Sequence, residues 1–323
     1  MKKLTRYALW LIAILLVAFT IFWFARPADV NFDRARSTVP NAEYSRFADV
    51  DGVRIHYQEK GAGETLVLIH GYTASTFAWK DVFDPLSQQF HVIAVDLKGF
   101  GFSSKPEGDY TRRAQGDLVN RFLERLGIER AILCGNSMGG EVAMNAAIRR
   151  PDRVSALILV DSSGVTVSGG GSVTPGVAGW PVIGPAIMSL ALISDSLVRD
   201  GLRQCFYDKS IVTDEQVAAY YRPLTTRAGQ RAAYLARKQA AINPIEPEIS
   251  KIWQPTLIIW GAEDELIPLE AGRKLNSLIA GSRLVVLDGC GHVPQAESPG
   301  RFMAEVSDFI LSLAIPTNHI ANR

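Results

Sequence analysis

The sequence predicts an α/β fold in which helices flank a mostly parallel central sheet, with a helical cap inserted after the sixth strand. Several short runs are almost wholly apolar and do not alternate inward and outward side chains, which is typical of parallel strands buried on both faces. Helix-like segments separate these runs, as in repeated βαβ units. The range 164–249 interrupts the alternation, because it begins with a Gly- and Pro-rich loop and continues as helix-like segments.

The predicted elements follow one another in regular order along the chain. The strand-like runs occupy 54–58, 65–70, 91–95, 131–135, 155–160, 256–260 and 283–287. The helix-like segments between them include 109–126, 138–150 and 268–279. This order divides the chain into an N-terminal segment 1–26, a polar tether 27–45, a core 46–163 and 250–315, a cap 164–249 and a tail 316–323.

The N-terminal segment has its own composition. Lys2, Lys3 and Arg6 precede an uncharged apolar run from Tyr7 to Phe24. Because roughly 17–25 apolar residues can cross a bilayer as a helix, residues 1–26 are predicted to be a transmembrane anchor. The basic flank predicts a cytoplasmic N-terminus, with the rest of the chain on the extracytoplasmic (periplasmic) side. The alternative is a secreted protein released by signal-peptide cleavage, although the bulky sequence FWFARPAD is unlike a cleavage site.

Composition and charge narrow the possible partners. The net charge is +1 and no basic tract is visible, so we expect no nucleic-acid partner. Three cysteines, Cys134, Cys205 and Cys290, are too few for a disulfide framework. We find no HExxH, no CxxC and no histidine pair at ligand spacing, and therefore expect neither a metal nor a cofactor. The oligomeric state is left open.

One serine lies in an unusual setting. The sequence Gly135-Asn136-Ser137-Met138-Gly139 follows a buried strand and begins a helix. A G-x-S-x-G turn of this kind reverses the chain sharply, so that the serine hydroxyl stands clear of the sheet. We expect strained backbone at Ser137 and no room for side chains at Gly135 and Gly139. The pattern is short, however, and it identifies a nucleophile only if partners follow in the order serine, acid, histidine.

A histidine meets this requirement by elimination. His56 and His91 lie in or beside early strands, His319 lies in the tail, and His70 precedes the serine. Only His292, in LDGCGHVPQ, follows the serine at the end of a strand. A general base must reach the serine hydroxyl and change its protonation state near the working pH. We therefore assign that role to His292.

The acid that orients the histidine is less tightly determined. The strand TLIIW is followed by a loop that contains Asp264, which is our first choice. Asp161, at the end of the preceding strand LILV, is the main alternative. Asp288 is too close to the histidine in sequence to be preferred.

An acyl-transfer site also requires donors for an oxyanion. One is expected to be the backbone N–H of Met138, directly after the serine. The second comes from the loop after an early strand, where His70 and Gly71 lead to the N–H of Tyr72. We expect His70 to brace this loop rather than take part in the chemistry.

With these residues placed, the chain resembles the α/β-hydrolase fold superfamily over about residues 45–315. The motifs that carry the resemblance occur in family order: HG at 70–71, GNSMGG at 135–140, GAED at 261–264 and CGH at 290–292. The sequences HGYTASTFAW and CGHVPQAESP resemble the lipolytic branch, in particular a membrane-anchored group similar to monoacylglycerol lipases. In that branch the cap shapes an acyl-chain pocket, which the resemblance implies for 164–249.

The resemblance implies a serine hydrolase that cleaves a hydrophobic carboxylic ester, such as an acylglycerol, through an acyl-enzyme. GNSMGG and CGH also occur in hydrolases that cleave carbon–carbon bonds of aromatic ring-fission products. Those enzymes usually have tryptophan after the histidine and a glycine-richer oxyanion loop, whereas this chain has Val293 and Tyr72-Thr73. Acyl transfer to an acceptor other than water, and a non-catalytic binding role, are the remaining alternatives.

Overall fold

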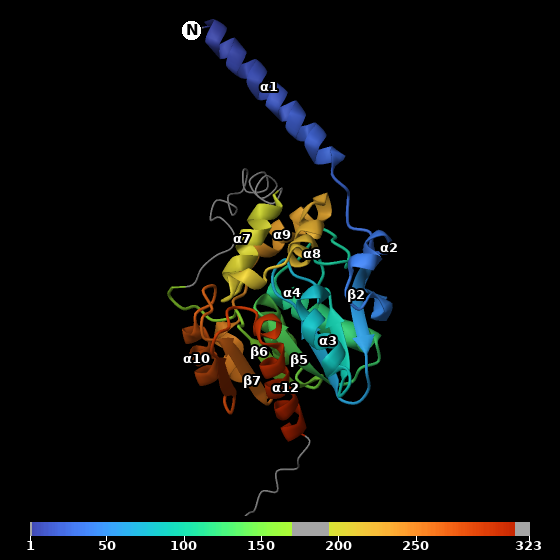
Figure 1. Cartoon of the computed structure of the whole chain (residues 1–323), viewed down its shortest axis with the longest axis vertical. Helices are drawn as coiled ribbons and strands as arrows, with labels where there is room; N and C mark the ends of the chain where they lie inside the picture. Colours follow the sequence, from blue (N-terminus) through green and yellow to red (C-terminus); the bar gives the residue numbers. More distant parts are fainter. Residues whose placement is uncertain (1, 170–193, 314–323) are drawn as a thin grey trace, which may run out of the picture.

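The computed structural model of this 323-residue chain describes residues 2–169 and 194–313 (Figure 1). The predicted tail 316–323 and the apolar cap sequence VIGPAIMSLALI, residues 182–193, lie outside the described residues. The remaining predicted elements can be compared with the structure directly.

One eight-stranded sheet forms the centre of the molecule, with the strand order β1-β2-β4-β3-β5-β6-β7-β8. Strands β1 and β2 pair antiparallel, β2 and β4 do the same, and all later neighbours are parallel. The predicted mostly parallel sheet is therefore confirmed. The strands are β1 (Ser45–Val50), β2 (Val53–Lys60), β3 (Thr65–Ile69), β4 (His91–Val95), β5 (Ala131–Asn136), β6 (Val154–Val160), β7 (Thr256–Gly261) and β8 (Arg283–Leu287).

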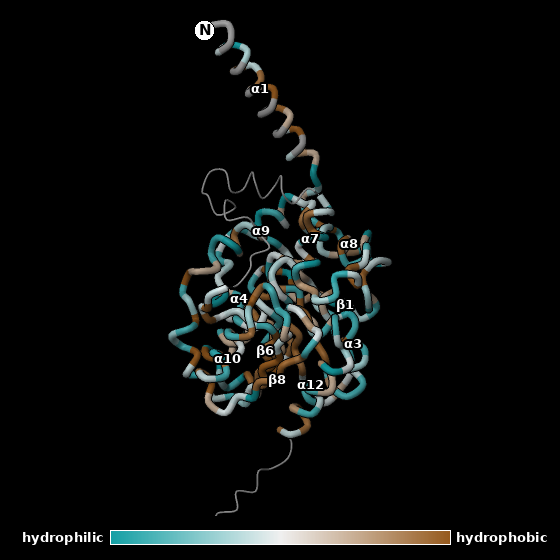
Figure 2. The backbone as a smooth tube through the Cα atoms, turned by 60° about the vertical axis from the view of Figure 1, so that its left-hand side comes forward, coloured by the Kyte–Doolittle hydropathy of each residue, from teal (hydrophilic) through white to brown (hydrophobic). Residues whose placement is uncertain are grey.

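Helices cover both faces of this sheet. Side chains alternate across β3, so that Val67 and Ile69 join one core cluster while Leu66 and Leu68 join the other. Figure 2 shows the resulting hydrophobic strands enclosed by a more polar exterior. The helices of the described residues are α1 (Lys2–Ala25), α2 (Phe32–Ala35), α3 (Lys80–Leu86), α4 (Arg112–Arg125), α5 (Met138–Arg149), α7 (Asp195–Cys205), α8 (Asp214–Leu224), α9 (Arg227–Lys238), α10 (Leu269–Leu278), α11 (Pro294–Glu297) and α12 (Pro299–Leu313).

The edge strand β1 is not among the strands that the sequence predicts. Its sequence SRFADV pairs only with β2, and Arg46 and Asp49 point to solvent. Edge strands are commonly short and polar, which weakens the apolar signal that marks the buried strands. The buried strands, by contrast, lie within one or two residues of their predicted bounds.

The N-terminal helix requires a correction. Helix α1 extends away from the body of the molecule in Figure 1. Within the residues that the structure describes, however, no helix is both long enough and apolar enough to cross a membrane. This finding overturns the predicted transmembrane anchor at residues 1–26 and the periplasmic placement built on it.

Residues 27–45 connect α1 to the sheet and contact both the core and the cap. Asp29 forms an ion pair with the buried Lys105 at 2.8 Å, and the carbonyl of Pro27 accepts a hydrogen bond from the N–H of Arg227 in α9. Phe32 packs edge-on against Phe102. These contacts hold the segment against the folded domain.

The described cap helices α7, α8 and α9 follow β6 in the chain, and Figure 1 shows them together at one end of the sheet. Val198, Leu202 and Val217 are buried where α7 meets α8. The cap therefore has a small apolar core of its own, placed over the strand ends that carry the predicted site.

Candidate active site

Ser137 lies at the turn between β5 and α5 and has left-handed backbone geometry, with φ 56° and ψ −120°. A residue other than glycine rarely adopts a positive φ, so this backbone conformation is strained and must be imposed by its surroundings. Hydrogen bonds supply the constraint, because the N–H of Ser137 donates to the carbonyl of Val160 at 2.9 Å and its own carbonyl accepts from Ser163 at 3.1 Å. The strain expected from the sequence is present.

Close backbone approach accounts for the glycines around this serine. A Cβ at Gly135 would lie 2.3 Å from the carbonyl oxygen of Gly139, and one at Gly139 would lie 2.2 Å from that of Ile69. A Cβ at Gly71 would come within 3.2 Å of the Ser137 Cβ. Larger residues at 135 and 139 would push helix α5 away from the sheet, and a larger residue at 71 would crowd the serine itself.

His292 lies in the loop after β8 and is paired with Asp264 in the loop after β7. Its Nδ1 lies 2.7 Å from Oδ2 of Asp264, and both side chains are almost fully buried. The Asp264 carboxylate also accepts the N–H groups of Leu266 at 2.8 Å and Ile267 at 3.0 Å through Oδ1. Because a carboxylate oxygen accepts, Nδ1 donates this hydrogen bond, and Nε2 is the ring nitrogen that Asp264 leaves for another partner.

Asn136, the variable residue of the G-x-S-x-G pattern, has a role that the sequence does not reveal. Its side-chain amide donates to the carbonyl of His292 at 3.0 Å and to that of Val160 at 3.2 Å. The residue directly before Ser137 therefore fixes the backbone of the histidine 156 positions away. Only the fold brings these two residues together, so no local sequence pattern could have identified the contact.

His70 braces the loop that follows β3, as the sequence analysis expects. Its Nε2 accepts the N–H of Leu97 at 3.0 Å, so the proton resides on Nδ1, which donates to the carbonyl of Gly71 at 2.7 Å. Burial lowers the pKa of this histidine, since the imidazolium form would be desolvated. A neutral His70 thus joins the ends of β3 and β4 beneath the loop.

The two N–H groups predicted to bind an oxyanion belong to Met138, directly after the serine, and to Tyr72, in the loop after β3. Met138 is the first residue of α5, where helical N–H groups have no intrahelical partner. Tyr72 follows Gly71 in the braced loop, and its side-chain hydroxyl donates to the carbonyl of Ala233 in cap helix α9 at 2.9 Å. Both Tyr72 and Ser137 line the same cavity.

Asp161, the alternative acid in the sequence analysis, lies beside the pair rather than in it. It directly follows β6, has a positive φ of 43° and is completely buried. Asp161, Asp264 and His292 each offer an atom within 4.8 Å of the others, which is the spacing of a possible metal site. His292 Nδ1 already binds the Asp264 carboxylate, so the geometry fits an acid–base pair better than a set of free ligands.

A cavity of about 160 Å³ opens above Ser137 and His292. The cap contributes most of its apolar wall, and none of the described lining residues is Lys, Arg, Asp or Glu. Residues 170–193, which precede α7 in the chain, also contain none of these four residue types. The apolar cap residues of the lining are Leu197, Val198, Leu202, Phe206, Tyr220 and Leu224.

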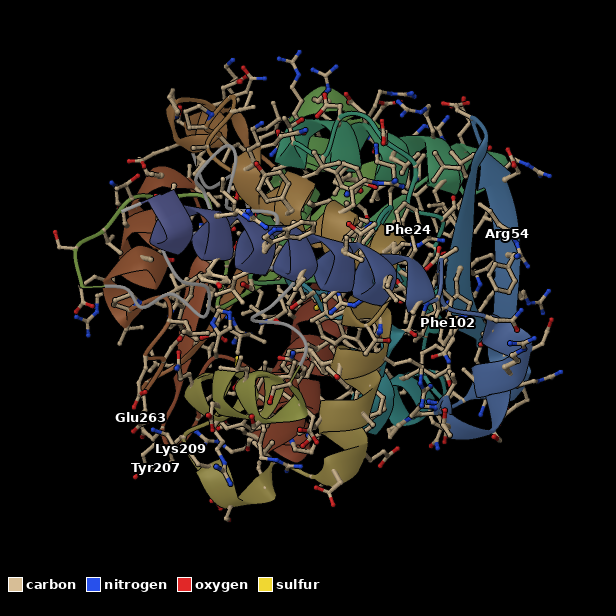
Figure 3. The ribbon with its side chains drawn as sticks, turned by 90° about the horizontal axis from the view of Figure 1, so that it is seen from above. Phe24, Arg54, Phe102, Tyr207, Lys209 and Glu263 are labelled. Atoms are coloured by element: carbon tan, nitrogen blue, oxygen red, sulfur yellow. The ribbon has the colours of Figure 1, made fainter. Side chains whose placement is uncertain are left out.

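The cap is tied directly to the histidine loop. The N–H of His292 donates to the carbonyl of Cys205, the last residue of α7, at 2.8 Å. Glu297 connects the histidine loop to the cap by accepting two hydrogen bonds of 2.9 Å. Its Oε2 accepts from the N–H of Gly291 in the loop, and its Oε1 accepts from the N–H of Tyr207 in the cap. Lys209 of the cap also forms an ion pair with Glu265 of the loop after β7 at 3.5 Å, in the region where Figure 3 labels Tyr207, Lys209 and Glu263. The site is therefore assembled from the core and the cap together.

A strained serine, a histidine with a free Nε2 and a carboxylate behind it can carry nucleophilic catalysis in a shared cavity. This is the arrangement expected of a serine hydrolase. A family model for the alpha/beta hydrolase fold matches residues 64–299. The chain belongs to this family.

The chain is also similar to individual members of the family. It is 32% identical over 281 residues to a 2-hydroxy-6-oxo-2,4-heptadienoate hydrolase of Pseudomonas putida, covering 84% of this chain and 97% of that protein. The crystal structure of a meta-cleavage product hydrolase from Pseudomonas fluorescens matches with a TM-score of 0.73 at 29% identity, over 84% of this chain and 99% of that one. The structure of a bacterial membrane phospholipase A matches with a TM-score of 0.72 at 29% identity, over 96% of this chain and 99% of the other.

Proposed function

We propose that this hydrolase cleaves carboxylic esters that carry an uncharged, apolar acyl group. The observation that carries the proposal is the cavity above Ser137, which has an apolar wall and no charged residue among its described lining residues. Such a cavity stabilises an acyl chain by burying apolar surface. It offers no counter-ion to a charged substrate, whose desolvation would therefore oppose binding.

In the proposed acylation step, the Ser137 hydroxyl attacks the ester carbonyl while His292 Nε2 accepts its proton. Asp264 stabilises the imidazolium that forms, through the hydrogen bond to Nδ1. The new oxyanion is bound by the N–H groups of Tyr72 and Met138. The carbon–oxygen bond to the alcohol then breaks, and the proton on His292 passes to the leaving alkoxide.

Deacylation reverses these roles with water as the nucleophile. His292 takes a proton from the water, whose oxygen attacks the acyl carbon and forms a second oxyanion in the same position. The bond to Ser137 breaks, the serine recovers its proton from His292 and a carboxylic acid leaves. An acyltransferase would follow the same route with another hydroxyl in place of water, so only the acceptor separates these two activities.

Carbon–carbon bond hydrolysis is the second candidate, and the named relatives support it more strongly than ester hydrolysis. Four curated relatives at 28–32% identity are named as hydrolases of 2-hydroxy-6-oxo-dienoates or of 2-hydroxymuconate semialdehyde. Three of these names specify a dienoate or dienoic acid, which is a carboxylate at neutral pH. Arg112 is a buried cation of the described core, but it pairs with Glu141 at 3.7 Å and does not line the cavity. Ester cleavage therefore remains our first proposal.

The lipolytic branch is the finer part of the proposal. The match to a membrane phospholipase A covers more of this chain than the matches to the ring-fission hydrolases, which supports a glycerolipid ester as substrate. A monoacylglycerol presents one acyl chain and an uncharged alcohol, and so fits an uncharged apolar cavity without a headgroup contact.

The test is a substrate panel on the purified full chain. We expect turnover of p-nitrophenyl esters and monoacylglycerols of increasing acyl length, weaker turnover of a ring-fission dienoate, and loss of turnover in Ser137→Ala. A phospholipid joins the panel to separate lipase from phospholipase activity. Dienoate hydrolysis that exceeds ester hydrolysis in kcat/KM would establish the second candidate instead.

Two controls make the panel decisive. Ser163→Ala removes a hydroxyl that lies beside the G-x-S-x-G turn and is not the nucleophile. This variant must therefore retain most of the activity. Ester turnover that survives in Ser137→Ala would refute the nucleophile assignment. A folded wild-type protein that turns over no member of the panel would support a binding role.

A further inference from the structure

Asp161 is a second carboxyl group behind the catalytic pair, and the proposed mechanism does not use it. It is completely buried at the end of β6, next to Asp264 at the end of β7. The two strands are parallel neighbours in the sheet, so the fold holds these two side chains together. An oxygen atom of Asp161 lies within 4.8 Å of one of Asp264. Two buried carboxylates at this separation cannot both be ionised without a large electrostatic cost.

The hydrogen bonds show which carboxyl group keeps its charge. Asp264 accepts three donors, namely His292 Nδ1 and the N–H groups of Leu266 and Ile267. Asp161 accepts only the N–H of Gly261, at 2.9 Å, through Oδ1. Its Oδ2 is buried without a hydrogen-bond partner. Donors stabilise the ionised form, so the negative charge belongs on Asp264 and the proton on Asp161.

A carboxylate has about four lone-pair positions for hydrogen bonds, and three of those on Asp264 are occupied. We propose that Asp161 is a neutral carboxylic acid whose Oδ2–H donates to Asp264, supplies the fourth hydrogen bond and holds the Asp264 carboxylate in the orientation that His292 requires. Asp161 is thus a positioning residue that acts through Asp264 and does not touch the substrate. The proposal rests on the triad assigned under Proposed function, but the protonation of Asp161 can be tested without any substrate.

The surrounding charges favour the neutral form as well. Burial and the neighbouring Asp264 raise the pKa of Asp161 well above its usual range, and Glu297 of α11 adds to the increase. Glu297, Glu263 and Cys290 lie close enough to interact electrostatically with one another or with Asp161. Cys205 of α7 faces Asp264, and burial keeps its thiol protonated by raising its pKa to about 12. His292 is the basic side chain beside these carboxyl groups, and Asp264 already binds its Nδ1.

The first test measures the protonation of Asp161 directly. Asp161→Asn keeps the shape, keeps an acceptor for the Gly261 N–H and keeps a donor for Asp264, but it cannot ionise. The infrared difference spectrum between wild type and Asp161→Asn at pH 7 must contain the carbonyl band of a protonated carboxylic acid. Asp288→Asn, which changes an exposed carboxylate in the loop after β8, is the matched control and must show a carboxylate band instead.

The same variant tests the pH dependence of stability. In the unfolded chain Asp161 loses its proton above about pH 4, whereas the folded protein retains it, so wild-type stability falls as the pH rises until the folded pKa is reached. The ratio of the unfolding equilibrium constants of wild type and Asp161→Asn must therefore rise about tenfold per pH unit above pH 4. A ratio that does not change with pH, or a carboxylate band in the infrared spectrum, overturns the proposal.

The positioning role has its own readout. Asp161→Asn, which still donates to Asp264, must keep kcat within a few-fold of wild type, while Asp161→Val must lower kcat by about tenfold or more with little change in KM. Equal losses in the two variants would show that the hydrogen bond to Asp264 has no positioning role. Because the spectrum and the unfolding data need no substrate, a failure of the ester proposal would leave them interpretable.

Discussion

Among the residues that the structure describes, two buried His–Asp pairs have the same local geometry. In one, Nδ1 of His292 lies 2.7 Å from Oδ2 of Asp264, and in the other Nδ1 of His56 lies 2.7 Å from Oδ2 of Asp96. Both aspartates also accept two backbone N–H groups, from Leu266 and Ile267 in the first pair and from Thr76 and Phe102 in the second. The hydrogen bonds alone do not distinguish the two pairs.

The surroundings of the two pairs differ completely. The rings of Phe32, Phe47 and Phe102 all lie within 5.4 Å of the His56 ring, centroid to centroid. The Nε2 atom of His56 is buried without a hydrogen-bond partner, and His56 itself is inaccessible to solvent. His292 instead lines the cavity that it shares with Ser137. A His–Asp pair is therefore a potential general base only where its second nitrogen faces open space and a nucleophile.

The largest expected effect concerns activity and separates the two pairs. His292→Gln should lower kcat/KM by about 10⁴-fold or more, because the proton acceptor for Ser137 is lost. His56→Gln should leave the kcat of the folded protein within a few-fold of wild type. Turnover of the best ester of the panel, normalised to active-site titration, measures both. A comparable loss in both variants would contradict the distinction between the pairs.

The second effect concerns stability, and its order is reversed. His56→Ala should lower the free energy of unfolding by about 3–5 kcal/mol, because Asp96 would remain as a buried charge without its partner. His292→Ala should cost less, because His292 borders a cavity, whereas His56 is completely buried. Urea unfolding monitored by circular dichroism gives both values. A larger loss in the His292 variant would show that the His292–Asp264 pair contributes more to the free energy of unfolding than the His56–Asp96 pair.

A smaller effect is expected from crowding the open site. Gly71→Ala would place a Cβ 3.2 Å from the Ser137 Cβ and 3.4 Å from Oδ1 of Asn136. A displaced serine should lower kcat by roughly 10–100-fold. Gly300→Ala is the matched control, since an added Cβ there meets nothing within 4 Å, and it should not affect kcat. Unchanged turnover in Gly71→Ala would show that catalysis tolerates a displacement of Ser137.

The smallest effect is a pH dependence from His70. Its pKa is lowered by burial, so the folded protein binds fewer protons than the unfolded chain below about pH 6.5, and stability falls as the pH falls. Between pH 7.5 and pH 5.5 wild type should lose about 1 kcal/mol more stability than His70→Asn. Chemical denaturation at the two pH values measures the difference. Parallel losses in the two proteins would place the acid sensitivity elsewhere.

Local sequence patterns were sufficient for much of the fold and for part of the site. The buried strands can be predicted from the sequence because parallel strands covered on both faces are apolar throughout. Ser137 is recognisable because a sharp strand-to-helix turn requires small neighbours, and His292 because only one histidine follows it at a strand end. Edge strand β1 was missed because only two of its six residues, Ala48 and Val50, are fully buried. The predicted membrane span was wrong, because no helix among the described residues is both long enough and apolar enough to cross a membrane.

By itself, then, the sequence determined the α/β architecture, the cap insertion and the order serine, acid, histidine. Only the tertiary structure decided which aspartate holds His292, that Asn136 secures the histidine backbone, and that Asp161 stands behind Asp264. It also decided that His56 is enclosed while His292 faces a cavity. The physical reason is that these properties depend on contacts between residues far apart in the chain, whereas strand burial and turn sterics depend on neighbours in sequence.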